Sequence, residues 1–122
     1  MTAAAGDRIL VVTTTVGSVD AAHALARRIV EQRLAACVQV DQPVRSFYRW
    51  RGELNEDAEA RLVIKTVAGA QPALQALFAE HHPYELPQFV ATFAQASEGY
   101  ARWVRGEVVL PGDGTLAAGP AA

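Results

Sequence analysis

Apolar residues recur in this sequence with two different spacings, and the order in which these spacings follow one another predicts the fold. Ile9 to Val12 is an unbroken aliphatic run, which is typical of a strand buried on both faces. Ser18 then provides a helix cap, and between positions 22 and 30 apolar residues recur every three or four residues. This second spacing indicates an amphipathic helix.

The next segment repeats the alternation of strand and helix. Strand character returns from Cys37 to Trp50, with Pro43 marking an edge or a bulge because proline lacks a backbone donor. Residues 58–67 alternate between apolar and polar positions, which predicts a third strand with one wetter face. A second helix is expected from Pro72 to the residue before Pro83.

A strand over residues 89–94 and a short helix that begins at Ser97 complete the pattern. The order β-α-β-β-α-β predicts an α+β, ferredoxin-like sandwich, an antiparallel sheet with helices on one face, followed by an extra C-terminal helix. Residues 8–110 are expected to form one domain. Residues 1–7 and 111–122 are rich in Ala, Gly and Pro, and we expect both to be flexible tails.

The charge balance and the cysteine count exclude several classes of protein. Thirteen acidic residues outnumber eleven basic ones, which argues against a partner as anionic as a nucleic acid. A single cysteine excludes a disulfide within the chain and a metal site made of cysteines alone. No apolar run approaches the roughly 20 residues that span a bilayer, and the first residues do not resemble a signal peptide. We therefore expect a cytoplasmic protein with no membrane partner.

A pair of histidines at the end of the second predicted helix is a candidate metal site. His81 and His82 precede Pro83, and Glu85 follows closely enough to supply a carboxylate ligand. Adjacent residues on a regular helix point about 100° apart, so both rings can reach one ion only where the helix unwinds. The alternative is structural, because a histidine at a helix C-terminus also caps the last carbonyl groups.

Lys65 is the only lysine of the chain and lies at the end of the third predicted strand. Its amine could hold an anion, or it could be a solvated charge at a strand end. Cys37 is expected to be buried as a small apolar side chain. No motif assembles a nucleophile, a base and an oxyanion hole, and we expect a protein without enzymatic activity.

Taken together, five segments of the sequence resemble the CutA family of divalent-cation tolerance proteins. They occur in the family's order over nearly the whole predicted domain: Leu34–Cys37, Ser46–Gly52, Lys65–Thr66, His82–Pro87, and Tyr100 with Trp103. The resemblance implies a ferredoxin-like trimer related to the PII signalling proteins and linked to tolerance of copper and other divalent metals.

The resemblance also implies a copper site, from which this sequence departs. Some family members bind copper through a cysteine at the end of the first strand and a histidine pair similar to His81 and His82. Thr14 stands where that cysteine would be. Loss of the thiolate removes the ligand most selective for Cu(I), which leaves the histidines for weak binding of Cu(II) or Zn(II).

Two functional hypotheses follow. In the first, the protein is a non-enzymatic, metal-responsive trimer that binds a divalent ion through His82, His81 and Glu85. In the second, it is a PII-like sensor that binds a small anionic metabolite or a nucleotide in clefts between subunits. Lys65 would then supply the charge, and Tyr84 would form part of the wall.

The length of the second strand independently predicts self-association. A strand over residues 36–50 would reach roughly 50 Å, whereas a domain of about 100 residues is only about 34 Å across. A projecting hairpin would expose Phe47, Tyr48 and Trp50 together with unpaired backbone groups. Pairing with a neighbouring chain through residues 44–52 would cover both, and the resemblance implies a cyclic homotrimer.

Overall fold

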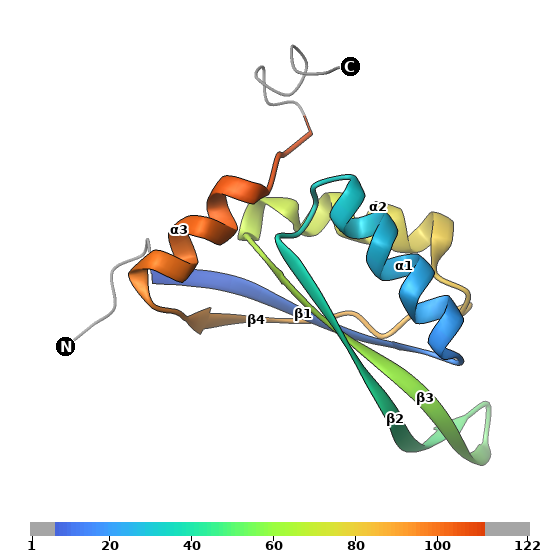
Figure 1. Cartoon of the computed structure of the whole chain (residues 1–122). Helices are drawn as coiled ribbons and strands as arrows, with labels where there is room; N and C mark the ends of the chain where they lie inside the picture. The colour runs from blue at the N-terminus through green and yellow to red at the C-terminus, as the bar shows by residue number, and fades with distance from the viewer. Residues whose placement is uncertain (1–6, 112–122) are drawn as a thin grey trace.

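The computed structural model describes residues 7–111, in which three α-helices and one short 3-10 helix accompany four strands (Figure 1). The tails expected at residues 1–7 and 111–122 lie almost entirely outside these residues. The elements in chain order are β1 (Arg8–Val16), α1 (Val19–Glu31), β2 (Cys37–Trp50), β3 (Glu53–Thr66), η2 (Ala68–Ala70), α2 (Gln71–His81), β4 (Val90–Gln95) and α3 (Glu98–Glu107).

The four strands form one antiparallel sheet in the order β2-β3-β1-β4. This arrangement confirms the prediction of an α+β fold with the order β-α-β-β-α-β and a helix added at the end. Two strands are longer than the sequence indicated. The first continues through the Thr13–Thr15 run, and the third begins at Glu53, because a tight hairpin turn lets Trp50 pair directly with Glu53.

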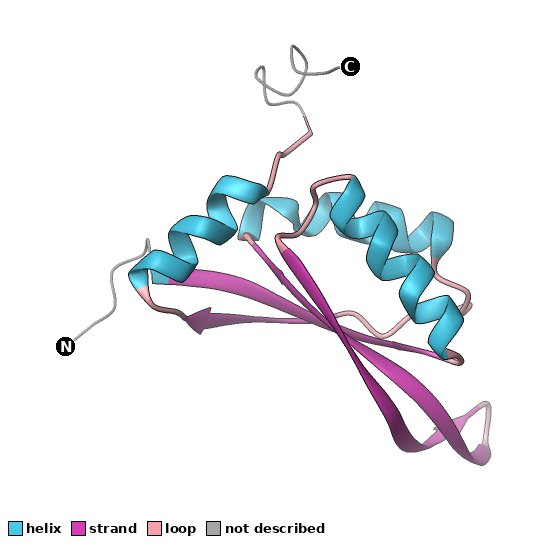
Figure 2. Ribbon diagram, viewed as in Figure 1, coloured by secondary structure: helices cyan, strands magenta, loops and turns pink. Residues whose placement is uncertain are grey.

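That turn consists of Arg51 and Gly52, which both have positive φ angles of 51° and 84°. Two positive φ values in a two-residue loop match the twist of a hairpin. The hairpin of β2 and β3 extends beyond the region that the helices cover, as Figure 2 shows. Its outer end therefore has no helix packed on it.

The register of β2 against β3 shifts by one residue near Pro43, as the sequence predicted. Asp41 pairs with Arg61, but Val44, three residues later, pairs with Glu59, two residues earlier. Paired residues of antiparallel strands point to the same face of the sheet. The bulge therefore places Ser46 and Tyr48, at alternate positions after Val44, on the same face as Glu59.

The main core lies between the sheet and the two helices α1 and α2. Alternate residues of β1 and β3 face these helices, and Val12, Leu62 and Ile64 have no exposed surface. A second, smaller cluster packs Ile9 of β1 against Ala101 and Val104 of α3. The helices are thus fixed by apolar contacts with both parts of the sheet.

Side-chain caps fix where two of the helices begin. Ser18 accepts a hydrogen bond from the backbone N–H of Ala21, and Ser97 accepts one from Tyr100. Helix α2 ends at His81, and His82 is already extended, as expected for a residue that precedes proline. This ending determines where the two histidines point.

Candidate functional site

A cleft of about 710 Å³ lies between the hairpin and the segment that follows α2. One wall comes from the hairpin strands and the other from the chain between Pro83 and Gln88. Its lining residues are Thr15, Ser46, Phe47, Tyr48, Trp50, Glu59, Pro83, Tyr84, Glu85, Leu86 and Gln88. Aromatic rings and two carboxylates dominate this surface.

Glu59 is a lining residue of the cleft that is only 9% exposed. Its two oxygens accept hydrogen bonds from the Ser46 hydroxyl at 2.5 Å and from the Tyr84 hydroxyl at 2.6 Å. Beside it, the Tyr48 hydroxyl donates to Asp57 at 2.5 Å. The hydrogen bond between Tyr84 and Glu59 connects the segment after α2 to strand β3, so Tyr84 has a fixed position over the hairpin.

Both tyrosine hydroxyls are held in their protonated, donating form. Burial, followed by the hydrogen bond to Glu59, raises the pKa of Tyr84 far above its usual value. The hydrogen bond to Asp57 is the main reason why the pKa of Tyr48 is also raised. The two phenols therefore present no negative charge to a ligand near neutral pH.

An ion pair connects the rim of the cleft to the hairpin turn. Arg51 donates to both oxygens of Glu85, at 2.8 and 2.9 Å, and its guanidinium group lies 5.1 Å from the centre of the Trp50 ring. Both charged side chains are well exposed, so this pair adds little to stability. Its effect is to keep Glu85 at the edge of the cleft, paired with a cation.

His82 fixes the position of the chain between Pro83 and Gln88, which forms the second wall of the cleft. Its Nδ1 accepts the backbone N–H of Tyr84 at 3.2 Å, so Nε2 carries the proton and donates to the Thr14 hydroxyl at 3.0 Å. The ring also packs against Phe78 and is 8% exposed. Burial lowers its pKa, and the imidazole is therefore neutral at pH 7.

Stability should depend on pH through this buried imidazole. An unfolded histidine titrates near pH 6.5, whereas folded His82 titrates at lower pH, so the unfolded chain binds more protons between these two values. The free energy of unfolding is expected to fall as pH decreases from 6.5 to the folded pKa. Urea unfolding between pH 8 and pH 5 should show a weaker dependence in His82→Gln than in the wild type. His23→Gln, on the exposed face of α1, controls for the loss of one imidazole; an unchanged slope in His82→Gln would contradict the expectation.

The structure does not bring the three predicted metal ligands together. His82 turns into the interior with both nitrogens occupied, while His81 stays on the outside of α2, with Nε2 3.9 Å from Glu80. Glu85 is held at the rim by Arg51. Among residues 7–111, no group of three or more His, Cys, Asp or Glu side chains is arranged to hold a metal ion. The helix does unwind at His82, but the extended backbone there separates the two imidazoles. From the sequence, such unwinding was the condition for both rings to reach one ion.

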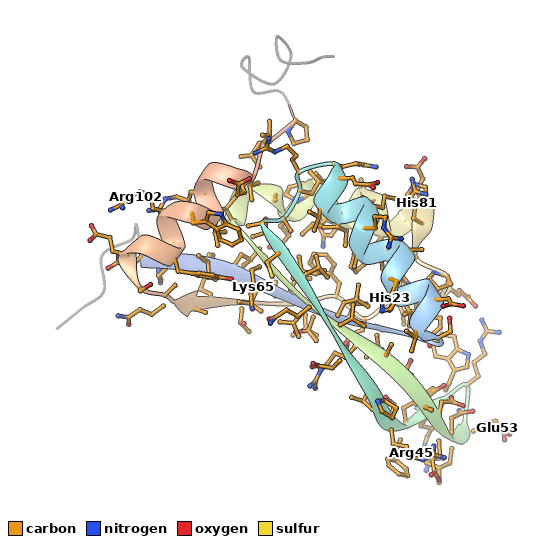
Figure 3. The ribbon with its side chains drawn as sticks, in the orientation of Figure 1. His23, Arg45, Glu53, Lys65, His81 and Arg102 are labelled. Carbon is orange, nitrogen blue, oxygen red and sulfur yellow. The ribbon has the colours of Figure 1, made fainter. Side chains whose placement is uncertain are left out.

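Lys65 and Tyr84, the two residues predicted to bind an anion, also lie apart within one chain. Lys65, the next-to-last residue of β3, donates to Gln39 at 2.6 Å (Figure 3). The hydroxyl of Tyr84 bonds to Glu59, six residues earlier on β3, which corresponds to about 20 Å along a strand. The cleft therefore contains Tyr84 but no lysine.

The structure also contains functional candidates that the sequence did not reveal. Glu59 and Ser46 line the cleft and are hydrogen-bonded to each other, yet each is an ordinary polar residue in a strand pattern. The bulge at Pro43 was the sequence signal that could have indicated them, because it determines which residues of β2 lie on the same face of the sheet as Glu59. Phe47, Tyr48 and Trp50, predicted to contact a neighbouring chain, are 68%, 42% and 38% exposed.

No helix within residues 7–111 has the length and apolar character needed to cross a bilayer. This finding agrees with the sequence, in which no long apolar run occurs.

Comparisons with known proteins identify the family. Residues 10–107 match the family described as CutA1 divalent ion tolerance protein. The divalent-cation tolerance protein CutA of Thermus thermophilus is 42% identical over 96 residues, which are 78% of this chain and 93% of that protein. The human protein CutA is 40% identical over 85 residues, 69% of this chain and 48% of the human one.

Solved structures agree with this assignment. The divalent cation tolerance protein from Thermus thermophilus superimposes with a TM-score of 0.79 at 39% identity, covering 84% of this chain and 99% of that one. The PII-like protein CutA from Nostoc sp. PCC 7120 gives a TM-score of 0.78 at 32% identity, with coverage of 84% and 99%. The chain therefore belongs to the CutA1 divalent ion tolerance protein family.

Proposed function

We propose that this chain acts in tolerance of divalent cations as a non-enzymatic binding protein, and that the cleft between the hairpin and residues 83–88 is its ligand site. The observation that carries the proposal is the hydrogen-bonded set of Ser46, Glu59 and Tyr84 inside a cleft of about 710 Å³. A cleft of this size with aromatic walls and a few fixed polar groups is typical of a small-molecule site.

The contacts of the described residues favour binding over catalysis. Thr14 and His82 are in hydrogen-bond contact, as a nucleophile and a base would be, but Thr14 has no exposed surface. In addition, the imidazole donates to the hydroxyl, whereas a general base must accept its proton. A substrate could not reach this pair without opening the core.

A ligand screen tests the proposal. We expect at least one class among small organic cations, neutral molecules and anions, each at millimolar concentration, to raise the melting temperature of the full chain. Gln88→Trp places a bulky ring in the cleft from an exposed position, and it should remove the shift. If no class stabilises the wild type, the cleft is not a ligand site and the proposal fails.

Direct binding of a metal is a second candidate, favoured by the exposed imidazole of His81 beside Glu80. This proposal keeps the expectation of weakly held Cu(II) or Zn(II) but assigns it to His81 alone, because metal binding at His82 would break a buried hydrogen bond. Calorimetric titration of the wild type should give weak binding that His81→Ala abolishes and that His23→Ala retains. Equal binding by the His81→Ala variant would contradict the assignment.

The assembly and the compartment also belong to the proposal. A PII-like homotrimer is supported by the family and by the exposed aromatic side chains of the hairpin. The cytoplasm remains the expected compartment, although a relative from Arabidopsis thaliana that is 33% identical is named as chloroplastic.

A further inference from the structure

We propose that the cleft selects a small organic cation, with an ammonium group held by Glu59 between the aromatic side chains of the hairpin and Tyr84. This inference rests on the proposed function, which makes the cleft a ligand site, and adds the chemical class of the ligand. Three properties of the cleft carry it: an unpaired buried charge, the aromatic walls and the sign of the lining charges.

The first property is the charge of Glu59. Glu59 as a whole residue is 9% exposed, and its carboxylate accepts hydrogen bonds from two hydroxyl groups, but neither Ser46 nor Tyr84 carries a positive charge. None of the basic side chains of residues 7–111 lies within ion-pair distance of Glu59, although five of them pair with other carboxylates: Arg33, Arg45, Arg51, Arg61 and Arg102. Buried carboxylates are normally compensated by a cation. A cationic ligand would supply the missing charge.

The second property is the aromatic wall. Phe47, Tyr48, Trp50 and Tyr84 all line the cleft. The first three also belong to the segment 44–52 that is expected to contact a neighbouring chain, so in the proposed homotrimer the cleft lies at the boundary between subunits. The face of an aromatic ring attracts a cation within about 6 Å of its centre, and most strongly so for tryptophan. Arg51 already uses Trp50 in this way at the rim, at 5.1 Å. An alkylammonium ligand offers both the charge for such contacts and the apolar surface that the rings would cover.

The third property is the absence of positive charge from the lining. Its charged residues are Glu59 and Glu85, and no lysine or arginine of residues 7–111 is among the lining residues. Arg51 compensates Glu85 at the rim, but an anion inside the cleft would still face the like charge of Glu59. A bare metal ion would meet no preformed set of three ligands in the described part of the chain, and the space is far larger than one ion needs. An organic cation matches the charge and the volume together.

A pair of probes of nearly equal shape isolates the effect of charge. Choline carries a quaternary ammonium group, and 3,3-dimethylbutan-1-ol replaces its nitrogen by carbon. Calorimetric titration of the full chain at low salt should give a dissociation constant at least tenfold lower for choline. Butylammonium should also bind, whereas citrate should not. This comparison uses the wild type, so it does not depend on whether a variant folds.

Variants then locate the charge. Glu59→Gln keeps one oxygen that can accept from one of the two hydroxyl groups, and its amide N–H can donate to the other. It should weaken choline binding about tenfold without changing the affinity for the neutral alcohol. Glu31→Gln, at the exposed end of α1, makes the same change in net charge and should leave choline binding unchanged.

The outcomes separate the inference from the proposed function. Equal affinity for choline and the alcohol, or citrate binding that Gln88→Trp removes, would overturn the cation assignment and leave the cleft as a ligand site. Choline binding that Glu59→Gln does not weaken would place the cation elsewhere and overturn the inference. If no probe binds and the wider screen gives no shift, the proposed function itself fails.

Discussion

Light scattering of the full chain at micromolar concentration is expected to give a mass three times that of one 13.1 kDa chain. The hairpin exposes Phe47 and Trp50, and the sheet ends in two edge strands, β2 and β4, with unpaired backbone groups. Contact between chains would pair these backbone groups and would cover the part of the two side chains that does not face the cleft. The double variant Phe47→Ala/Trp50→Ala removes the two large side chains and should shift the mass to that of one chain.

Val30→Ala provides the control for this experiment. Val30 is 42% exposed on α1, and the predicted contact at residues 44–52 does not include it. Its variant should keep the threefold mass. A wild-type chain that scatters as a monomer would contradict the trimer and leave the exposed aromatic residues of the hairpin without a role. A twofold mass would retain the contact but refute the threefold arrangement.

The largest loss of stability is expected from Leu62→Ala. Leu62 has no exposed surface and lies on β3 inside the main core, so truncation leaves a cavity. We expect the free energy of unfolding to fall by about 3 kcal/mol, within the range of about 2–5 kcal/mol for leucine in a packed core. Urea unfolding at one fixed chain concentration measures this loss, because subunit dissociation then contributes equally to both proteins.

Leu86→Ala removes the same atoms from a side chain that is 68% exposed. Its cost should stay below about 0.5 kcal/mol, as for most surface substitutions. Similar losses for the two variants would mean that Leu86 is buried by a neighbouring chain or that the core around Leu62 relaxes to fill the cavity.

The sequence predicted the elements of this fold because each one carries its own local signal. An unbroken aliphatic run marked the first strand and alternation marked the third. Ser18 and Ser97 marked two helix starts, and Pro43 marked the bulge. These signals depend on neighbours within a few positions. They can therefore be recognised without knowledge of which strands pair.

The cleft could not be predicted in the same way, because it depends on contacts between distant segments. Glu56 and Glu59 look alike in the sequence, yet Glu56 pairs with Arg45 in solvent while Glu59 is buried under Tyr84. The difference between the two environments comes only from the pairing register and from the path of the chain after α2. The same limit explains the histidines: their adjacency suggested one shared site, but the backbone at His82 sends the two rings in different directions.

The bulge between Asp41 and Val44 determines which changes of chain length the cleft can tolerate. Two residues of β2, at positions 42 and 43, lie opposite one residue of β3 there, so removing one of them would give regular pairing and leave Val44 opposite Glu59. Ser46 and Tyr48 would then remain on the same face as Glu59, and the contacts of the cleft could still form. Between Val44 and Tyr48 the pairing is already regular, and a change of one residue would turn the following side chains to the opposite face. A related chain can therefore be judged first by the number of residues it has between these two positions, before any of its side chains are compared.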